Sequence, residues 1–219
     1  MIKAVIFDLD GVLVTTDALH FKAWKTLAES LGITDFTEKD NIRQRGVSRM
    51  ASLEVVLEKT DKKYSMEEKL AMAEEKNKIY VKSLDTLSPK DLLPGVKDFM
   101  SFLKSKNIKM AVGSASKNTP LILEKTGLSD KFDAVSCGLD TQKSKPDPEV
   151  FLIAAKKLNV KPEDCVVIED SYAGIEAAKA GGMLAIALGM ASDSDIADYC
   201  SSSLESLDYK NMDIFGGDK

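Results

Sequence analysis

Short runs of Val, Ile and Ala recur along this chain, and helical patterns lie between them. The runs cover residues 4–7, 109–113, 134–136, 165–168 and 184–188. A strand that is apolar on both faces belongs to a parallel sheet with helices packed on each side. Strands that alternate with helices form βαβ units. The sequence therefore predicts an α/β fold whose core is a Rossmann-like parallel sheet.

Apolar residues between the runs have the spacing of amphipathic helices. Two sets fall at i, i+3, i+4 and i+7, namely Val96, Phe99, Met100 and Leu103, and Phe151, Ala154, Ala155 and Leu158. Each set predicts one buried stripe on a helix. Three helix starts are marked by proline after Thr119, by proline after Asp147, and by an Ala-rich segment after Ser171.

Residues 16–87 break the alternation, because they show helical periodicity and no convincing strand. One apolar stripe in this segment consists of Trp24, Leu27, Ala28 and Leu31. Ser65 and Glu68 have the spacing of a capping box. A stretch with proline and glycine follows and suits a linker. We expect an all-helical cap domain at 16–87, inserted into a core domain formed by 1–15 and 88–219, with a hinge at the two connections.

Charge and cysteine content exclude several classes of function. Lys and Arg number 30 against 35 Asp and Glu, and the net charge of −5 argues against general binding to nucleic acid or to an anionic membrane. His20 is the only histidine and the three cysteines have no Cys-x-x-Cys spacing, which excludes a zinc site built on His and Cys. A Ser-His-Asp triad would have to use His20, and the sequence has no Gly-x-Ser-x-Gly elbow to supply its serine.

The same features set expectations about location and assembly. The odd number of cysteines, and a strand pattern that starts at the first residues instead of a signal peptide, indicate a cytoplasmic protein. Apolar stretches all fall short of the roughly 18 residues that span a bilayer. No exposed apolar repeat suggests assembly, so we expect a monomer. The serine-rich segment 200–206 is expected to be a loop.

Two carboxylates follow the first predicted strand. Asp8 and Asp10 lie at i and i+2, so in extended chain they point the same way, at the carboxyl edge of the sheet. Their like charges repel, and a hard divalent cation with oxygen ligands would relieve this repulsion. The alternative is that both acids cap the turn and face solvent.

Three further polar segments follow predicted strands and fall at the same edge. They are Ser114-Ala115-Ser116-Lys117-Asn118, the turn that holds Lys145, and Glu169-Asp170. Small residues and hydroxyls before a helix suit a phosphate group. Taken singly, the serines could be helix caps, Lys145 a surface lysine and the two acids a helix start. Their coincidence with Asp8 and Asp10 at one edge argues for a site.

These side chains are suited to phosphoryl transfer. A carboxylate can attack phosphorus and form an aspartyl phosphate, while Mg²⁺ and a lysine neutralise the surrounding oxygens. A second carboxylate two residues further on can donate a proton to the leaving oxygen and later withdraw one from the acceptor. One loop, with Asp8 and Asp10, can therefore supply both roles.

With these residues in order, the chain resembles the haloacid dehalogenase superfamily. The four matching motifs are Asp8-Leu9-Asp10-Gly11 within VIFDLDGVL, Ser114, Lys145 before Pro146, and Glu169-Asp170. The helical insertion resembles the small cap of one subclass. The runs 45–49 and 114–118 resemble the sugar phosphomutases of that subclass, and the similarity extends over nearly the whole chain.

The resemblance implies a role for each matching residue. It makes Asp8 the nucleophile and Asp10 the general acid and base. Mg²⁺ would lie on Asp8, Asp170 and the backbone carbonyl of Asp10, with Glu169 nearby. The implied substrate and phosphate ligands are Ser114, Ala115 and Lys145 for the group in transfer, Arg49, Ser116, Lys117 and Asn118 for a second phosphate, and Arg45 and Gly46 in the cap. Thr16, His20 and Lys76 would help to place Asp10 and to register cap closure.

The implied reaction is the Mg²⁺-dependent interconversion of β-glucose 1-phosphate and glucose 6-phosphate, through an aspartyl phosphate and β-glucose 1,6-bisphosphate. A small sugar phosphate is thus the expected partner. One alternative is a sugar-phosphate phosphatase that uses the same Asp8 and Asp10 and admits water as acceptor. Another is a catalytically silent binding protein on this fold, against which the intact motifs argue.

Some positions depart from the family pattern or have simpler interpretations. Thr15 stands where many members have aspartate, which affects the hinge and not the chemistry, and Arg45 replaces the lysine of some mutases while keeping the charge. Arg45 and Arg49 could also be surface charges. His20 could be a packing residue, and Lys76 could lie on a solvated charged helix face.

Overall fold

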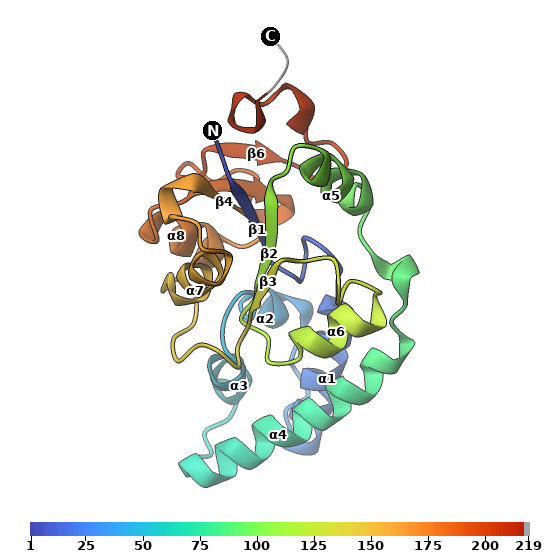
Figure 1. Ribbon diagram of the computed structural model, residues 1–219. Helices are drawn as coiled ribbons and strands as arrows, with labels where there is room; N and C mark the ends of the chain where they lie inside the picture. Colours follow the sequence, from blue (N-terminus) through green and yellow to red (C-terminus); the bar gives the residue numbers. More distant parts are fainter. Residues whose placement is uncertain (217–219) are drawn as a thin grey trace.

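The computed structural model describes residues 1–216, and its core is a parallel sheet of six strands in the order β3-β2-β1-β4-β5-β6 (Figure 1). The strands are β1 (Ala4–Phe7), β2 (Lys109–Gly113), β3 (Ala134–Ser136), β4 (Cys165–Glu169), β5 (Leu184–Leu188) and β6 (Tyr199–Ser201). All five predicted strands are present. β4 continues one residue past its predicted end, to Glu169.

The sixth strand was not predicted: β6 (residues 199–201) overlaps the start of the segment 200–206, which was expected to be a loop. It pairs with β5 in parallel, with Ala187 opposite Cys200. Its three residues are exposed or half-buried at the edge of the sheet. The pairing of β6 uses backbone groups, and such a short edge strand leaves no run of apolar residues in the sequence.

Helices cover both faces of the sheet, and β1 at its centre is buried on both sides. The core helices are α5 (Val96–Ser105), α6 (Thr119–Lys125), α7 (Glu149–Leu158) and α8 (Tyr172–Ala180). Val5 and Phe7 belong to an apolar cluster with Phe99 of α5, whereas Ile6 belongs to a second cluster with Phe151 of α7. This alternation along one strand confirms the predicted α/β core with helices on both faces.

The segment between β1 and α5 consists largely of helices. They are α1 (Asp17–Ser30), α2 (Glu38–Ile42), α3 (Arg49–Leu57) and α4 (Met66–Ser83). Trp24, Phe36 and Leu53 belong to an apolar cluster of their own. In Figure 1 these helices lie beyond the end of the sheet toward which β1 runs. Residues 16–87 are all described and contain no strand; the domain boundaries at 15/16 and 87/88 remain a prediction.

Local signals locate most of the helix starts. Ser65 caps α4 with a capping box, and Ser171 caps α8 through its hydroxyl. α6 begins at Thr119, as its proline signal predicts. α7 begins at Glu149, two residues after Asp147. Asp147 instead accepts the Glu149 N–H at 3.0 Å.

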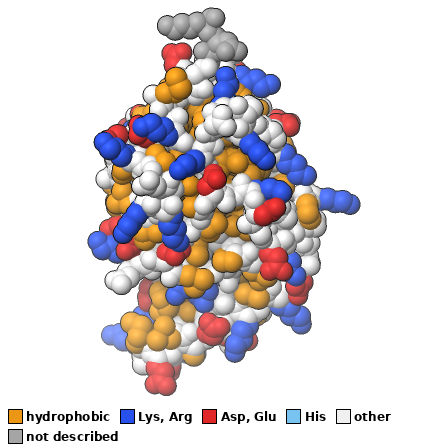
Figure 2. All heavy atoms as spheres, viewed as in Figure 1, with side chains coloured by type: hydrophobic (Ala, Val, Ile, Leu, Met, Phe, Trp, Pro, Cys, Tyr) orange, Lys and Arg blue, Asp and Glu red, His pale blue; other side chains and the backbone are white. Residues whose placement is uncertain are grey.

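The surface carries charged side chains of both signs, which are interspersed over the face shown in Figure 2. Surface lysines pair with nearby acids, for example Lys3 with Asp164 and Lys179 with Asp198, each at 2.7 Å. Ion pairs of this surface kind contribute little to stability. Among the residues described, no helix has both the length and the apolar character that crossing a membrane requires.

Candidate active site

A buried lysine lies between two carboxylates at the carboxyl edge of the sheet. β1 and β4 are neighbours, with Phe7 opposite Ile168, so Asp8 and Glu169 lie side by side. Lys145 Nζ donates to Asp8 Oδ1 at 2.5 Å and also to Glu169 Oε1. The Lys145 side chain is 1% exposed. The alternative that Lys145 is a surface lysine is therefore wrong.

Burial and charge act in opposite directions on these groups. Burial lowers the pKa of Lys145, but the charges of Asp8 and Glu169 outweigh it and hold the pKa above its ordinary value. Burial raises the pKa of Asp8 to about 7, against the lowering effect of Lys145. The pKa of Asp170 rises to about 8, first through burial and then through repulsion by Glu169 and Asp8. The acids together carry more charge than one lysine compensates.

Asp8, Glu169 and Asp170 form a cluster that could hold a cation. Each offers one carboxylate oxygen, and the three oxygens lie within 4.8 Å of one another. Carboxylate oxygens are the ligands that hard divalent cations prefer. The donor set and the raised pKa values of Asp8 and Asp170 both fit the binding of a divalent cation at this point. The side chain of Asp10 is not a member of this cluster.

Gly11 and Ser171 shape the cluster. Gly11 has a φ of +83°, and a Cβ at this position would lie 2.1 Å from Asp170 Oδ2, so only glycine allows the carboxylate to approach. Ser171 donates its N–H and its hydroxyl to Glu169 Oε2, both at 2.9 Å. Since Lys145 holds the other oxygen, Glu169 is fixed at both ends of its carboxylate.

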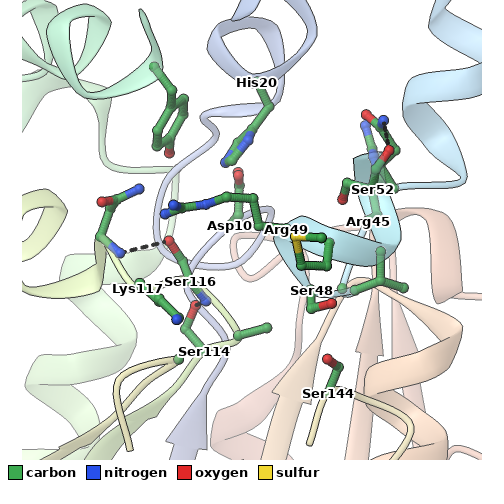
Figure 3. Close-up of a pocket in the computed structure, with 18 of the residues that line it drawn as sticks. Asp10, His20, Arg45, Ser48, Arg49, Ser52, Ser114, Ser116, Lys117 and Ser144 are labelled. Carbon is green, nitrogen blue, oxygen red and sulfur yellow. Dashed lines mark hydrogen bonds between the residues drawn. The ribbon is translucent and has the colours of Figure 1, made fainter. Parts of the chain in front are cut away.

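Asp10 is held by the start of the helical segment 16–87, here called the cap segment. Its Oδ1 accepts the Thr16 N–H at 2.7 Å, and its Oδ2 accepts the Thr16 hydroxyl. Tyr80 donates its hydroxyl to Thr16 Oγ1 at 3.0 Å. Burial raises the pKa of Asp10, although the bonds from Thr16 oppose this. Figure 3 shows the carboxylate facing His20. A half-buried carboxyl group with a raised pKa is suited to carrying a proton.

Buried Lys76 pairs with the half-buried His20 next to Asp10. Lys76 Nζ lies 2.7 Å from His20 Nδ1, 4.5 Å from the centre of the Trp24 ring and 4.7 Å from that of Tyr80. Lys76 is 3% exposed, so the alternative of a solvated charged face is wrong. Burial, together with the charge of Arg49, lowers the pKa of Lys76 to about 7. Burial and Lys76 lower the pKa of His20 well below its usual range, which leaves a neutral ring that can accept from Lys76.

The loop between β2 and α6 carries the predicted phosphate ligands Ser114 to Asn118. Ser114 is buried, and its hydroxyl accepts the Ser116 N–H at 3.2 Å. The Ser116 hydroxyl accepts the Asn118 N–H, also at 3.2 Å. A Cβ on Gly138 would lie 2.3 Å from the Ala115 carbonyl oxygen, so a second loop packs closely against this one. Hydrogen bonds within the loop thus fix the direction of its polar groups.

The cap contributes two arginines from either side of a glycine turn. Arg45 donates to Asp17 Oδ2 at 2.8 Å, and its Nη1 lies 3.8 Å from Asp170 Oδ2. A Cβ on Gly46 would lie 2.8 Å from Ser171 Oγ, so the cap segment lies close against the core here. In Figure 3 the Arg49 guanidinium extends toward Ser116 and Lys117. Both arginines are half-buried, and the surface-charge alternative does not describe them.

A cavity of about 650 Å³ connects these groups, with walls from both the cap segment and the core. The predicted site residues that line it are Asp8, Asp10, His20, Arg45, Gly46, Arg49, Lys76, Ser114, Ala115, Ser116, Lys117, Asn118 and Asp170. The other three predicted residues lie behind the cavity wall. Thr16 bonds to Asp10, and Lys145 bonds to both Asp8 and Glu169. The structure therefore brings together every residue of the predicted site.

Sequence reasoning missed several residues of the site. Asp17 pairs with Arg45, and Asn77 accepts from Arg49 Nη2 at 2.8 Å. Tyr80 holds Thr16 and stacks on the His20 ring at 3.9 Å. The one available signal was helical spacing, because Tyr80 lies four residues after Lys76 on the same face of α4.

The comparisons with known proteins agree with this fold. A family model described as haloacid dehalogenase-like hydrolase matches residues 2–182. The chain belongs to this family, and the predicted superfamily is confirmed. A β-phosphoglucomutase from Bacillus subtilis (strain 168) is 44% identical over 189 residues, which cover 85% of this chain and 83% of that protein.

A crystal structure of β-phosphoglucomutase from Clostridium difficile has a TM-score of 0.92 and 42% identity, and the match covers 98% of this chain and 97% of that one. The predicted similarity to sugar phosphomutases is thereby confirmed. A phosphorylated carbohydrates phosphatase from Thermotoga maritima is also similar, with 38% identity over 184 residues, which cover 83% of this chain and 82% of that protein.

Proposed function

We propose that this chain interconverts β-glucose 1-phosphate and glucose 6-phosphate through an aspartyl phosphate on Asp8 and β-glucose 1,6-bisphosphate. The observation that carries the proposal is a second group of cationic and polar side chains, suited to a phosphate, on the same cavity. Ser114 and Lys145 belong to the Asp8 end, whereas Arg49, Lys117 and Asn118 form the other group. A mutase that works through a bisphosphate needs two phosphate sites, and a simple phosphatase needs one.

Asp8 supplies the nucleophile. One of its carboxylate oxygens forms a bond to phosphorus, and the bond between phosphorus and the sugar oxygen breaks. Lys145 supports the ionised form of Asp8, since its ammonium group donates to the carboxylate. The same lysine and Ser114 are placed to stabilise negative charge on the phosphoryl oxygens.

Asp10 moves the proton. In the first half-reaction it donates a proton to the sugar oxygen that leaves phosphorus. In the second it withdraws a proton from the hydroxyl group that attacks the aspartyl phosphate, so the two half-reactions restore the enzyme. Burial raises the pKa of Asp10, which favours the protonated form that the first step needs. Thr16 fixes both oxygens of the carboxylate and so keeps it directed into the cavity.

Asp8, Glu169 and Asp170 would hold Mg²⁺, with the backbone carbonyl of Asp10 as a further ligand. The bound ion supplies positive charge that neutralises the phosphoryl oxygens. Enclosure of the sugar phosphate between the cap segment and the core excludes water, which otherwise hydrolyses an aspartyl phosphate. Sugar phosphates of similar size share the reacting group, and the partner class is therefore a small sugar phosphate.

The test uses β-glucose 1-phosphate, Mg²⁺ and a catalytic amount of β-glucose 1,6-bisphosphate. Glucose 6-phosphate and free phosphate are measured separately. We expect isomerisation to exceed phosphate release, and the Asp8→Asn variant to lose both activities. Phosphate release without isomerisation would support the phosphatase alternative, which the relative from Thermotoga maritima represents. Normal turnover by Asp8→Asn would exclude the proposed nucleophile.

A further inference from the structure

Asn77 of α4 joins the cap segment to the core at the proposed second phosphate site, which Arg49, Lys117 and Asn118 form. Its Oδ1 accepts from Arg49 Nη2 at 2.8 Å and from Asn118 Nδ2 at 3.0 Å. Arg49 is the first residue of α3, and Asn118 directly precedes α6 in the core. A flipped amide would place an NH₂ group against two donors, so these contacts require the carbonyl oxygen of Asn77 at this point.

Both donors keep hydrogens for a ligand. Arg49 Nη2 and Asn118 Nδ2 each carry two hydrogens, and each gives one to Asn77. The second hydrogen on each nitrogen is available to an anion. Asn77, Arg49, Lys117 and Asn118 all line the cavity. The contact to Asn77 therefore orients two phosphate donors without using up their capacity to bind phosphate.

The neutral charge of Asn77 matters as much as its geometry. An uncharged amide orients Arg49 without cancelling the charge that an anion needs. An acidic residue, Glu74, pairs with Arg49, with its Oε2 3.4 Å from Arg49 Nη1. The Glu74 side chain is 57% exposed, so solvent screens much of its effect.

We propose that Asn77 is a positioning residue that makes the second phosphate site depend on contact between the cap segment and the core. The inference rests on the proposed function and deepens it. The site needs one donor from each side, and Asn77 joins them through a single oxygen atom. A ligand with two phosphates is bound by this pair while its other phosphate lies at Asp8. A ligand that occupies only the Asp8 end does not use Asn77.

The test measures binding, and it does not depend on turnover. Trp24 is the only tryptophan and lines the cavity, so its fluorescence can report a bound ligand. Asn77→Ala is compared with its parent in an Asp8→Asn background with Mg²⁺, using β-glucose 1,6-bisphosphate and inorganic phosphate as probes. The loss of two oriented donors should weaken bisphosphate binding about tenfold and phosphate binding by less than about threefold. Equal weakening of both probes, or none, would overturn the proposal.

Two further variants separate positioning from folding. Asn77→Asp keeps an acceptor oxygen for both donors, but its charge should also weaken bisphosphate binding, and added salt should reduce this effect. Glu74→Ala removes the other partner of Arg49 and leaves the bridge to Asn118, so it should bind both probes as the parent does. Unchanged bisphosphate binding by Asn77→Asp would also contradict the proposal. A chain that binds bisphosphate through Asn77 but makes no glucose 6-phosphate would overturn only the proposed function.

Discussion

Replacing Lys76 by methionine should remove a pH-dependent component of stability. Lys76 is 3% exposed, and burial, with a contribution from Arg49, lowers its pKa from the ordinary 10.5 to about 7. This change corresponds to about 5 kcal/mol against the charged form, at roughly 1.4 kcal/mol per pKa unit. Methionine has a similar length and can fill the space between the Trp24 and Tyr80 rings without carrying a charge.

The sign of the effect follows from proton binding. In the unfolded chain Lys76 has its ordinary pKa of 10.5, so between about pH 7 and pH 10.5 the unfolded state binds the extra proton. Stability rises with pH wherever the unfolded state binds more protons. The unfolding free energy of the wild type should therefore rise through this window. Lys76→Met lacks this rise, and its loss of the contact to His20 adds a cost of about 1–3 kcal/mol that is independent of Lys76 ionisation.

The assay is urea unfolding of wild type and Lys76→Met at several pH values from about 7 to about 10. The stability of the variant relative to wild type should fall by several kcal/mol across this range, and by at most about 5 kcal/mol. Lys78→Met is the matched control, because Lys78 lies on the same helix with its side chain 68% exposed. It should follow the wild-type profile. A constant difference between wild type and Lys76→Met at every pH would refute the argument.

Three other predictions concern the core, the acidic loop and the cation. Phe99→Ala removes a fully buried ring that packs on Phe7 at 5.8 Å, and should lower the unfolding free energy in urea by about 3–5 kcal/mol. Leu139→Ala, at 67% exposure, should change it by no more than about 0.5 kcal/mol, and equal effects would contradict the assigned core. Gly11→Ala should abolish turnover, because its Cβ would lie 2.1 Å from Asp170 Oδ2; near-normal rates would exclude that constraint. Removal of divalent cations with EDTA should stop turnover and Mg²⁺ should restore it, whereas activity that persists in EDTA would count against a cation at Asp170.

The positions of the central strands and the four motifs could be predicted because they depend on local patterns. A strand buried on both faces shows as a run of apolar residues, and the polar residues that follow it must lie at one edge of a parallel sheet. Asp8 and Glu169 meet at that edge for this reason. The edge strand β6 gave no such signal, because backbone pairing holds it and its side chains remain partly exposed.

The environment of each charged residue could not be predicted in this way. Lys76 has charged neighbours in the sequence, which favours a solvated helix face, yet the structure buries it against His20, 56 residues away. The role of Asn77 likewise depends on Arg49 and Asn118, which lie in separate elements.

By itself, then, the sequence determined the α/β core, the helical insertion and the acids and lysine at the sheet edge, since periodicity and strand order depend on neighbouring residues. Only the tertiary structure decided which charges are buried and which polar atoms meet at the interface between the cap segment and the core. Burial and hydrogen bonding at that interface depend on contacts between residues that are distant in sequence, and these contacts set the pKa values of Asp10 and Lys76.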